Sequence, residues 1–163
     1  MLPVEHVLVI YFFMHFNFLP GIRAFAGIAF SVVLTSDVPH MTEHQPIVYD
    51  KVLLNDGNGY NPSSGIFTCP VRGVYLFMYH LGVQDLTNPA GVQTWIHLTI
   101  NGHAQNSATA DTTESSQELQ GSNSAIVQLS QGDTVWVETY LPGHSNSLYG
   151  HQLLNTFSGV LLY

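Results

Sequence analysis

Histidine is the residue type in this 163-residue chain that is best suited to chemistry. The chain holds nine histidines but only three lysines and arginines together, and its formal net charge is −8 at pH 7 with the histidines neutral. Histidine ordinarily changes its charge between about pH 5 and 8, and its neutral imidazole is a common metal ligand. Most of the nine are expected to be ordinary surface or core residues, but metal binding is a chemistry that the composition suggests.

His40 and His44 are the histidine pair whose spacing is most informative, and Glu43 lies beside them. Two histidines four residues apart bind metal readily on a helix, but Pro39 and Pro46 bracket the segment and argue against a helix. A loop could still place both imidazoles on a transition metal ion. The alternative is that both are solvated surface residues.

Catalysis and nucleic-acid binding find little support. The chain contains neither a Gly-x-Ser-x-Gly elbow nor a His-Glu-x-x-His motif. Its three basic residues cannot build a patch that neutralises phosphates, which excludes nucleic acid as a partner. Cys69 is the single cysteine, so an internal disulfide is impossible, and its apolar surroundings predict a small buried side chain. An enzyme is the least favoured class.

Short β-strands are the elements that must position these side chains. After residue 26 the chain shows no helical periodicity over ten residues, and Gly, Pro and Asn turns separate short apolar or alternating segments, which predicts an all-β sandwich. Asn101-Gly102 predicts a tight hairpin turn, and a second turn is expected at 55–59. Residues 105–123 are expected to form a polar loop. The expected strands are 28–34, 47–54, 73–81, 94–100, 125–129, 134–141 and 156–162.

The strand at 73–81 has no polar face in its central part. Alternate side chains of a strand point to opposite faces, and both sets are apolar here, which predicts burial on both faces. The two sets are Tyr75, Phe77 and Tyr79, and Val74, Leu76 and Met78.

The N-terminus is typical of a targeting segment. An apolar run from Val7 to Leu19 is interrupted by His15 and Asn17, and the small-x-small sequence 24–26 follows. This predicts a signal peptide over residues 1–26 and a single secreted domain over 27–163, with no membrane attachment after cleavage. The n-region carries Glu5 and no basic residue, so a signal anchor and a misread start stay open as alternatives.

A spaced set of aromatic residues and glycine identifies a family. In order, these positions are Tyr49, Asn55, Tyr60, Phe67, Gly73, Tyr75, Phe77 and Tyr79. The set resembles the signature of the C1q globular-head domain, which prefers Phe where this chain has Tyr49. The segments 131–136, 147–150 and 156–163 also resemble that family. The resemblance covers about residues 25–163.

The resemblance implies a ten-stranded jelly-roll sandwich, like that of tumour necrosis factor, which assembles as a homotrimer. In that family the sheet holding the 73–81 strand and the C-terminal strand faces the trimer axis. The residues that would fill the core or the subunit interface are Tyr75, Phe77, Tyr79, Phe157, Leu161 and Tyr163.

The resemblance also implies a possible calcium site. Some heads of the family hold calcium with acidic side chains in the loop that here spans about 110–118, where Asp111, Glu114 and Glu118 are the acidic residues. Calcium takes several oxygen ligands, which carboxylates and backbone carbonyls supply. The alternative is a solvated acidic loop.

The function implied is non-enzymatic recognition. The chain resembles the stalkless secreted C1q-domain proteins of bivalve molluscs, which are regarded as innate-immune pattern-recognition proteins. Its expected partners are copies of itself and microbial surface glycans or lipopolysaccharide-like molecules, bound through loops at 105–123 and 141–149. Two alternatives stay open: metal or mineral handling by a histidine-rich extracellular protein, and signalling as a ligand of tumour-necrosis-factor type.

Overall fold

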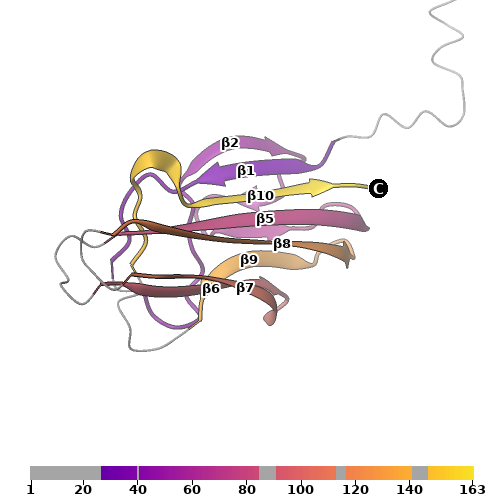
Figure 1. Ribbon diagram of the computed structural model, residues 1–163. Coiled ribbons are helices and arrows are strands. Elements are labelled where there is room, and N and C mark those ends of the chain that lie inside the picture. Colours follow the sequence, from indigo (N-terminus) through magenta and orange to yellow (C-terminus); the bar gives the residue numbers. More distant parts are fainter. Residues whose placement is uncertain (1–26, 40, 85–90, 113–116, 141–146) are drawn as a thin grey trace, which may run out of the picture.

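The computed structural model describes residues 27–39, 41–84, 91–112, 117–140 and 147–163 (Figure 1). Within these ranges the chain forms ten β-strands and a short 3-10 helix. The strands are β1 (Ala29–Val33), β2 (Lys51–Asp56), β3 (Tyr60–Asn61), β4 (Ile66–Thr68), β5 (Gly73–Val83), β6 (Gln93–Ile100), β7 (His103–Asp111), β8 (Leu119–Leu129), β9 (Thr134–Thr139) and β10 (Thr156–Leu161), and the 3-10 helix is η1 (His151–Leu153).

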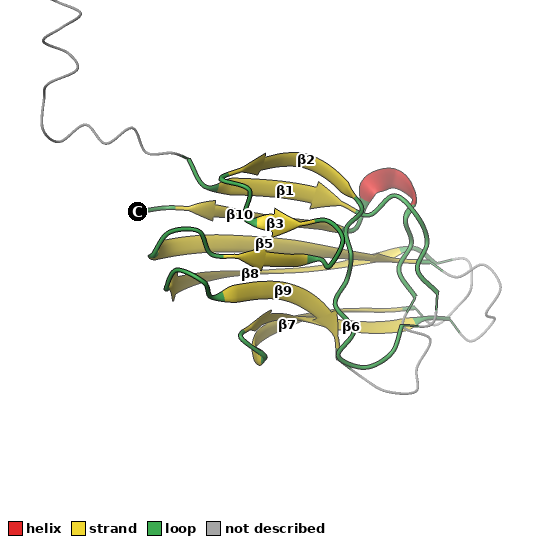
Figure 2. Ribbon diagram, turned by 180° about the vertical axis from the view of Figure 1, so that it is seen from behind, coloured by secondary structure: helices red, strands yellow, loops and turns green. Residues whose placement is uncertain are grey.

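The strands form two antiparallel five-stranded sheets, and the predicted jelly-roll sandwich is confirmed. The first sheet has the order β2-β1-β10-β5-β8 and the second has the order β3-β4-β9-β6-β7. Figures 1 and 2 show the two layers from opposite sides, with β9 beside β6 in the second sheet. Strands distant in sequence are therefore neighbours, as in the pairing of Phe157 on β10 with Tyr79 on β5.

Aromatic rings from both sheets fill the space between the layers. Phe30 on β1 has its ring centroid 5.0 Å from that of Phe67 on β4 and 4.8 Å from that of Phe157 on β10. Phe77 on β5 stacks on Phe157 at 6.0 Å. All four side chains are buried. Because buried aromatic pairs contribute beyond the area they remove from water, this cluster is a main source of stability.

Gly159 makes the aromatic packing possible. A Cβ atom at this position would lie 2.5 Å from the Phe30 ring and 2.7 Å from the Phe77 ring. Gly73, a motif position, has a related role at the start of β5, where a Cβ atom would lie 2.7 Å from the backbone oxygen of Tyr163. Both glycines allow ring or backbone contacts that a methyl group would prevent.

The predicted turns are present. Asn101 and Gly102 have φ angles of 49° and 82°, and they connect β6 to β7. Positive φ at both central residues is the geometry that Asn-Gly favours in hairpins. In the turn after β2, the Asn55 side chain donates to the Tyr60 carbonyl at 2.9 Å and accepts from the Tyr60 amide at 3.1 Å. Asn55 therefore braces the turn that carries the motif into β3.

Two predicted elements were wrong. Residues 47–50 lie outside the strand that was expected to begin at 47, because β2 starts at Lys51. The expected polar loop at 105–123 is mostly strand, since β7 extends to Asp111 and β8 begins at Leu119. Small residues misled the prediction: the inward side chains of β7 include Ala108 and Ala110, which are buried but weakly hydrophobic.

Side-chain amides close the sandwich along β7 and β8, which belong to different sheets. The Asn106 amide donates to the Ser124 carbonyl at 2.7 Å, and the Asn123 amide donates to the Ser107 carbonyl at 2.7 Å. These bonds satisfy backbone carbonyl groups at the sheet edges. Asparagine side chains therefore connect β7 and β8, which have no backbone hydrogen-bond ladder between them.

The strand predicted to be buried on both faces is fully buried on one only. Tyr75, Phe77 and Tyr79 point inward and have no exposed surface, whereas Met78 on the opposite face is 38% exposed. The outward face of β5 is therefore apolar but only partly covered within one chain.

The predicted signal peptide, residues 1–26, lies outside the described residues and stays a prediction. In the part of the chain that the structure describes, no helix has the length and apolar character needed to cross a membrane.

We expect Gly159→Ala to lower the free energy of unfolding by about 1–3 kcal/mol, because the added methyl group overpacks the aromatic cluster. Urea denaturation of the two proteins measures the difference. Gly27→Ala is the matched control, since a Cβ atom there would meet no atom within 4 Å. Equal destabilisation by the two substitutions would contradict the proposed role of Gly159.

Candidate functional site

A buried histidine and a buried glutamate face each other on the outer side of the second sheet. His97 on β6 is the direct partner of Glu138 on β9 in the antiparallel register. The neighbours of His97, Ile96 and Leu98, point into the core, so alternation turns His97 outward. His97 is nevertheless only 4% exposed and Glu138 only 7%.

A loop before β2 covers this pair and carries His44 over it. The His44 amide donates to the Thr139 carbonyl at 2.9 Å, and the Thr139 amide donates to the Gln45 carbonyl at 3.2 Å. The Thr139 hydroxyl also donates to the Thr42 carbonyl. His44 has a left-handed φ of 56°, which non-glycine residues adopt when surrounding contacts hold it. These bonds fix His44 against β9.

The three side chains converge on one carboxylate oxygen. The Nδ1 atom of His44 lies 3.3 Å from the Oε1 atom of Glu138, and the Nε2 atom of His97 lies 3.4 Å from the same oxygen. One ligand atom from each residue lies within 4.8 Å of the others. His97 Nε2 is nevertheless poorly aligned with the carboxylate, and it has no hydrogen-bond partner in the described part of the chain.

Neighbouring donors keep Glu138 ionised. Burial by itself raises the pKa of this carboxyl group, but hydrogen bonds from Trp136 and His44 outweigh burial and hold the pKa below its ordinary value. The Trp136 indole donates to the Oε2 atom at 2.6 Å. The carboxylate is therefore held by one oxygen, while the other faces the two imidazoles.

Burial keeps His97 neutral. It lowers the pKa of His97, the negative charge of Glu138 opposes this effect, and the charge of His44 adds to the lowering. The Tyr140 ring lies 4.5 Å from the His97 ring, centroid to centroid, and covers it. A neutral imidazole has a nitrogen lone pair, so His97 can offer a nitrogen ligand beside the Glu138 carboxylate.

Only one of the two predicted metal-binding histidines lies among the described residues. His44 joins His97 and Glu138 in the cluster, whereas His40 lies outside the described residues. Sequence reasoning missed His97 and Glu138 because they lie on different strands, far from His44 in the chain. The alternation around His97 was the one available signal, since it placed a histidine on a strand face opposite Ile96 and Leu98.

The acidic residues predicted to bind calcium do not form a recognisable cluster within the described residues. Asp111 at the end of β7 is exposed and accepts a hydrogen bond from the Gln93 amide at 3.0 Å. Glu118 is exposed just before β8, and Glu114 lies outside the described residues. Two exposed carboxylates supply too few of the six to eight oxygen ligands that calcium takes. Calcium binding at Asp111, Glu114 and Glu118 stays a prediction.

The residues predicted for the core or the subunit interface divide between two locations. Tyr75, Phe77, Tyr79 and Phe157 have no exposed surface and pack in the core of a single chain. Leu161 packs at the edge of this core. Tyr163, which is 74% exposed, is not a core residue.

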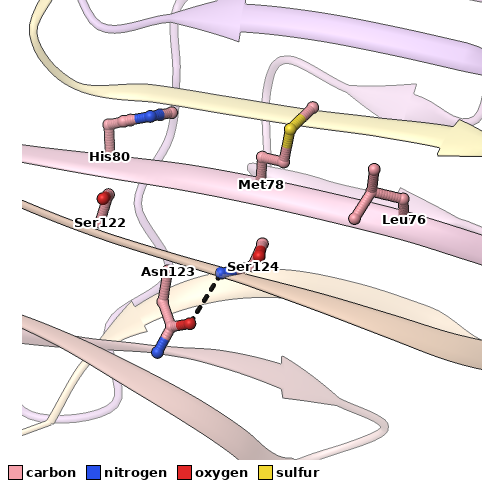
Figure 3. Close-up of a pocket in the computed structure, with 6 residues that line it drawn as sticks. All are labelled: Leu76, Met78, His80, Ser122, Asn123 and Ser124. Atoms are coloured by element: carbon pink, nitrogen blue, oxygen red, sulfur yellow. Dashed lines mark hydrogen bonds between the residues drawn. The ribbon is translucent and has the colours of Figure 1, made fainter.

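The outward face of the first sheet carries a shallow groove of about 470 Å³. Leu76, Met78 and His80 of β5 point to the same side of the strand, and Ser122 and Ser124 of β8 line the groove beside them (Figure 3). Asn123, between the two serines, points away (Figure 3).

Along β5, the residues on this face and their partners on the neighbouring strands change from apolar at Leu76 to polar at His80. Leu76 lies between Val160 on β10 and Ile126 on β8, which is 67% exposed. Two residues further along β5, Met78 lies between two serines, and then His80 bonds the Thr156 hydroxyl at 2.9 Å. The apolar end is the part of the face that covering by another molecule would stabilise most.

Comparison with known proteins identifies a single domain type. The C1q domain model matches residues 29–162. Over 144 residues the chain is 35% identical to the collagen alpha-1(X) chain of Mus musculus, a match that covers 87% of this chain and 20% of that protein. It is 36% identical over 136 residues to the complement C1q tumor necrosis factor-related protein 2 of Homo sapiens, covering 83% of this chain and 44% of that protein.

Solved structures with the same fold agree. The globular domain of the zebrafish complement 1qA protein has a TM-score of 0.67 and 24% identity, and the match covers 83% of this chain and 98% of that one. The Eiger TNF of S. frugiperda has a TM-score of 0.62 and 13% identity, covering 85% of this chain and 94% of that one. The chain spans less than half the length of the curated relatives described above.

In the metal-free protein we expect Glu138→Gln to lower the pKa of His97 further, because the substitution removes the negative charge that opposes burial. His44→Asn should raise this pKa, since it removes a nearby positive charge. A titration of the histidine Cε1 protons by nuclear magnetic resonance, with a chelator present, measures both changes. His103→Asn, in the exposed end of β7, is the control. A His97 pKa that rises in Glu138→Gln would contradict the assigned electrostatics.

Proposed function

The chain belongs to the C1q domain family, and we propose that it is a secreted, non-enzymatic recognition protein that assembles as a homotrimer and binds molecules of microbial surfaces. The observation that carries the proposal is the family match over residues 29–162. Two outer faces of the sandwich also support the proposal. The outer face of the first sheet is apolar, and that of the second sheet is rich in aromatic and hydroxyl groups.

The outward face of the first sheet supports self-association. The row formed by Val160, Leu76 and Ile126 is apolar, and Met78 continues it. Ile126 is 67% exposed and Met78 38% exposed, and the removal of such surface from water is favourable by about 25 cal/mol per Å². Complement C1q tumor necrosis factor-related proteins and C1q heads share this fold, and the resemblance to them implies a trimer built on this sheet.

The outer face of the second sheet supports ligand binding. The Trp95 and Tyr140 rings lie 6.3 Å apart there, centroid to centroid, and Tyr140 is 38% exposed. Beside Trp95, β7 presents Thr109 and Ser107, which are exposed. An aromatic surface next to hydroxyl groups suits sugars, whose rings have apolar faces and hydroxyl edges. Because 105–123 is mostly strand, these outward side chains replace that loop as the binding candidates.

A signalling ligand of tumour-necrosis-factor type is the second candidate. The likeness to the Eiger TNF of S. frugiperda and to murine APRIL, both at a TM-score of 0.62, favours it. At 13% and 15% identity these likenesses concern the fold. The family match favours the C1q type of function.

We expect Ile126→Glu to dissociate the assembly while leaving the domain folded, because a charge placed on the apolar face opposes its burial. Analytical ultracentrifugation should give a trimer for the unmodified protein and smaller species for the variant. Val71→Glu is the matched control, since Val71 is 51% exposed and precedes β5. A monomeric unmodified protein at micromolar concentration would contradict the proposed trimer.

We expect the protein to bind bacterial glycans or lipopolysaccharide, and Tyr140→Ala to weaken that binding about tenfold, equivalent to about 1.4 kcal/mol. Calorimetry against purified lipopolysaccharide, peptidoglycan and mannan measures the affinity. Val71→Ala is the control, because Val71 is an exposed apolar residue that precedes β5. Absence of binding to the whole panel would count against microbial recognition, and equal loss in both variants would count against the Trp95–Tyr140 surface.

A further inference from the structure

The nitrogen–oxygen distances in the cluster of His44, His97 and Glu138 are longer than those of a tightly hydrogen-bonded triad. A single carboxylate oxygen lies 3.3 Å from one imidazole nitrogen and 3.4 Å from another. Both distances are long for a charge-assisted hydrogen bond, which is about 2.7–2.9 Å. His97 Nε2 is buried and has no hydrogen-bond partner in the described ranges, although a buried polar atom normally has one.

The same separations fit the ligands of a metal ion. With metal–ligand distances of about 2.0–2.2 Å, two ligands of a tetrahedral ion lie about 3.3–3.6 Å apart. The distances from His44 Nδ1 and His97 Nε2 to Glu138 Oε1 both fall in this range. All three ligand atoms lie within 4.8 Å of one another, so a small movement of the exposed His44 side chain completes the set. Two imidazole nitrogens and a carboxylate oxygen are ligands that zinc accepts.

The surroundings of the cluster match those of a metal site. The Trp136 indole donates to Glu138 Oε2 at 2.6 Å, which leaves Oε1 facing the imidazoles. Glu43 Oε1 lies 3.7 Å from His44 Nε2, the ring nitrogen turned away from the cluster. Metal-bound histidines and carboxylates usually have such outer partners, which orient the ligand atoms.

From these observations we propose that His44, His97 and Glu138 bind a divalent transition metal ion of the zinc type. The ion joins the loop that carries His44 to strands β6 and β9, and three protein ligands leave a fourth position for water or for an atom of a bound molecule. The site differs from the calcium site expected at Asp111, Glu114 and Glu118, which would use oxygen ligands. It goes beyond the proposed function, since metal binding needs neither self-association nor a microbial ligand.

Substitutions of the three ligands differ in how much they are expected to disturb the fold. Removal of His97 or Glu138 changes a buried pair and risks misfolding. His44 is on an exposed loop, and asparagine tolerates its left-handed backbone conformation. His44→Asn therefore removes a ligand with little risk to the fold, and His103→Asn is the matched control for an exposed histidine outside the cluster.

The first experiment is calorimetry of the chelator-treated full chain with zinc, with calcium and magnesium as hard-cation comparisons. We expect saturable zinc binding that His44→Asn weakens at least about tenfold and that His103→Asn leaves unchanged. Zinc should also raise the melting temperature of the unmodified protein and of His103→Asn more than that of His44→Asn. Zinc binding that survives His44→Asn unchanged, or absence of zinc binding to the unmodified protein, overturns the proposal.

The second experiment tests the role of Trp136 as a positioning residue. Trp136→Phe keeps an aromatic ring but removes the donor to Glu138, and Trp95→Phe is the matched control, because Trp95 Nε1 has no hydrogen-bond partner among the described residues. We expect about 10–100-fold weaker zinc binding in Trp136→Phe and no change in Trp95→Phe. The visible absorption of bound cobalt, used in place of zinc, should shift in Trp136→Phe alone. Identical affinities and spectra in the two variants overturn the proposed geometry.

Discussion

The contact between the aromatic rings of the two sheets is the constraint on which the rest of the structure depends. Phe67 on β4 of the second sheet packs against Phe30 and Phe77 of the first sheet, and these rings can approach because Gly159 beside Phe30 and Phe77 has no side chain. Since strand side chains alternate, burying one set of residues fixes which set points outward along the same strands. On β5 this constraint turns Leu76 and Met78 outward, and on β6 the inward placement of Ile96 and Leu98 turns His97 outward. Both candidate functional faces are thus consequences of how the core is packed.

The second sheet buries ionisable groups on its outer face. The free-energy cost of burying them is reduced by neighbouring hydrogen-bond donors. A buried carboxylate is unfavourable unless donors or charges compensate it. Glu138 receives hydrogen bonds from Trp136 and His44, and these hold its pKa low despite burial. His97 Nε2 has no hydrogen-bond partner among the described residues. A buried nitrogen without a partner beside a well-supported carboxylate is costly for a purely structural pair, and the proposed metal ion would remove that cost by bonding to both atoms.

The fold could be predicted from the sequence because its determinants are local or strongly patterned. Asn101-Gly102 specifies a turn within two residues, and Gly73 with Tyr75 and Phe77 forms a spaced motif that carries the family resemblance. Strand β7 could not be predicted, because Ala108 and Ala110 are too small to give a hydrophobic pattern and its outward residues are polar. The cluster could not be predicted either. His44, His97 and Glu138 meet only through the pairing of β6 with β9 and the hydrogen bonds of Thr139, which no local spacing reveals.

The two outer faces belong to opposite sheets, and this separation has a physical consequence for recognition. Association through the outward face of the first sheet, around Leu76 and Ile126, would use a different surface from the outer face of the second sheet. An assembly built in this way presents several copies of the Trp95–Tyr140 surface and of the histidine–glutamate cluster on its outside. Linked sites raise the effective concentration of each further contact, so the proposed trimer would bind a repetitive surface more tightly than a single glycan. The sandwich core keeps the two faces apart, which is the arrangement that the proposed multivalent recognition requires.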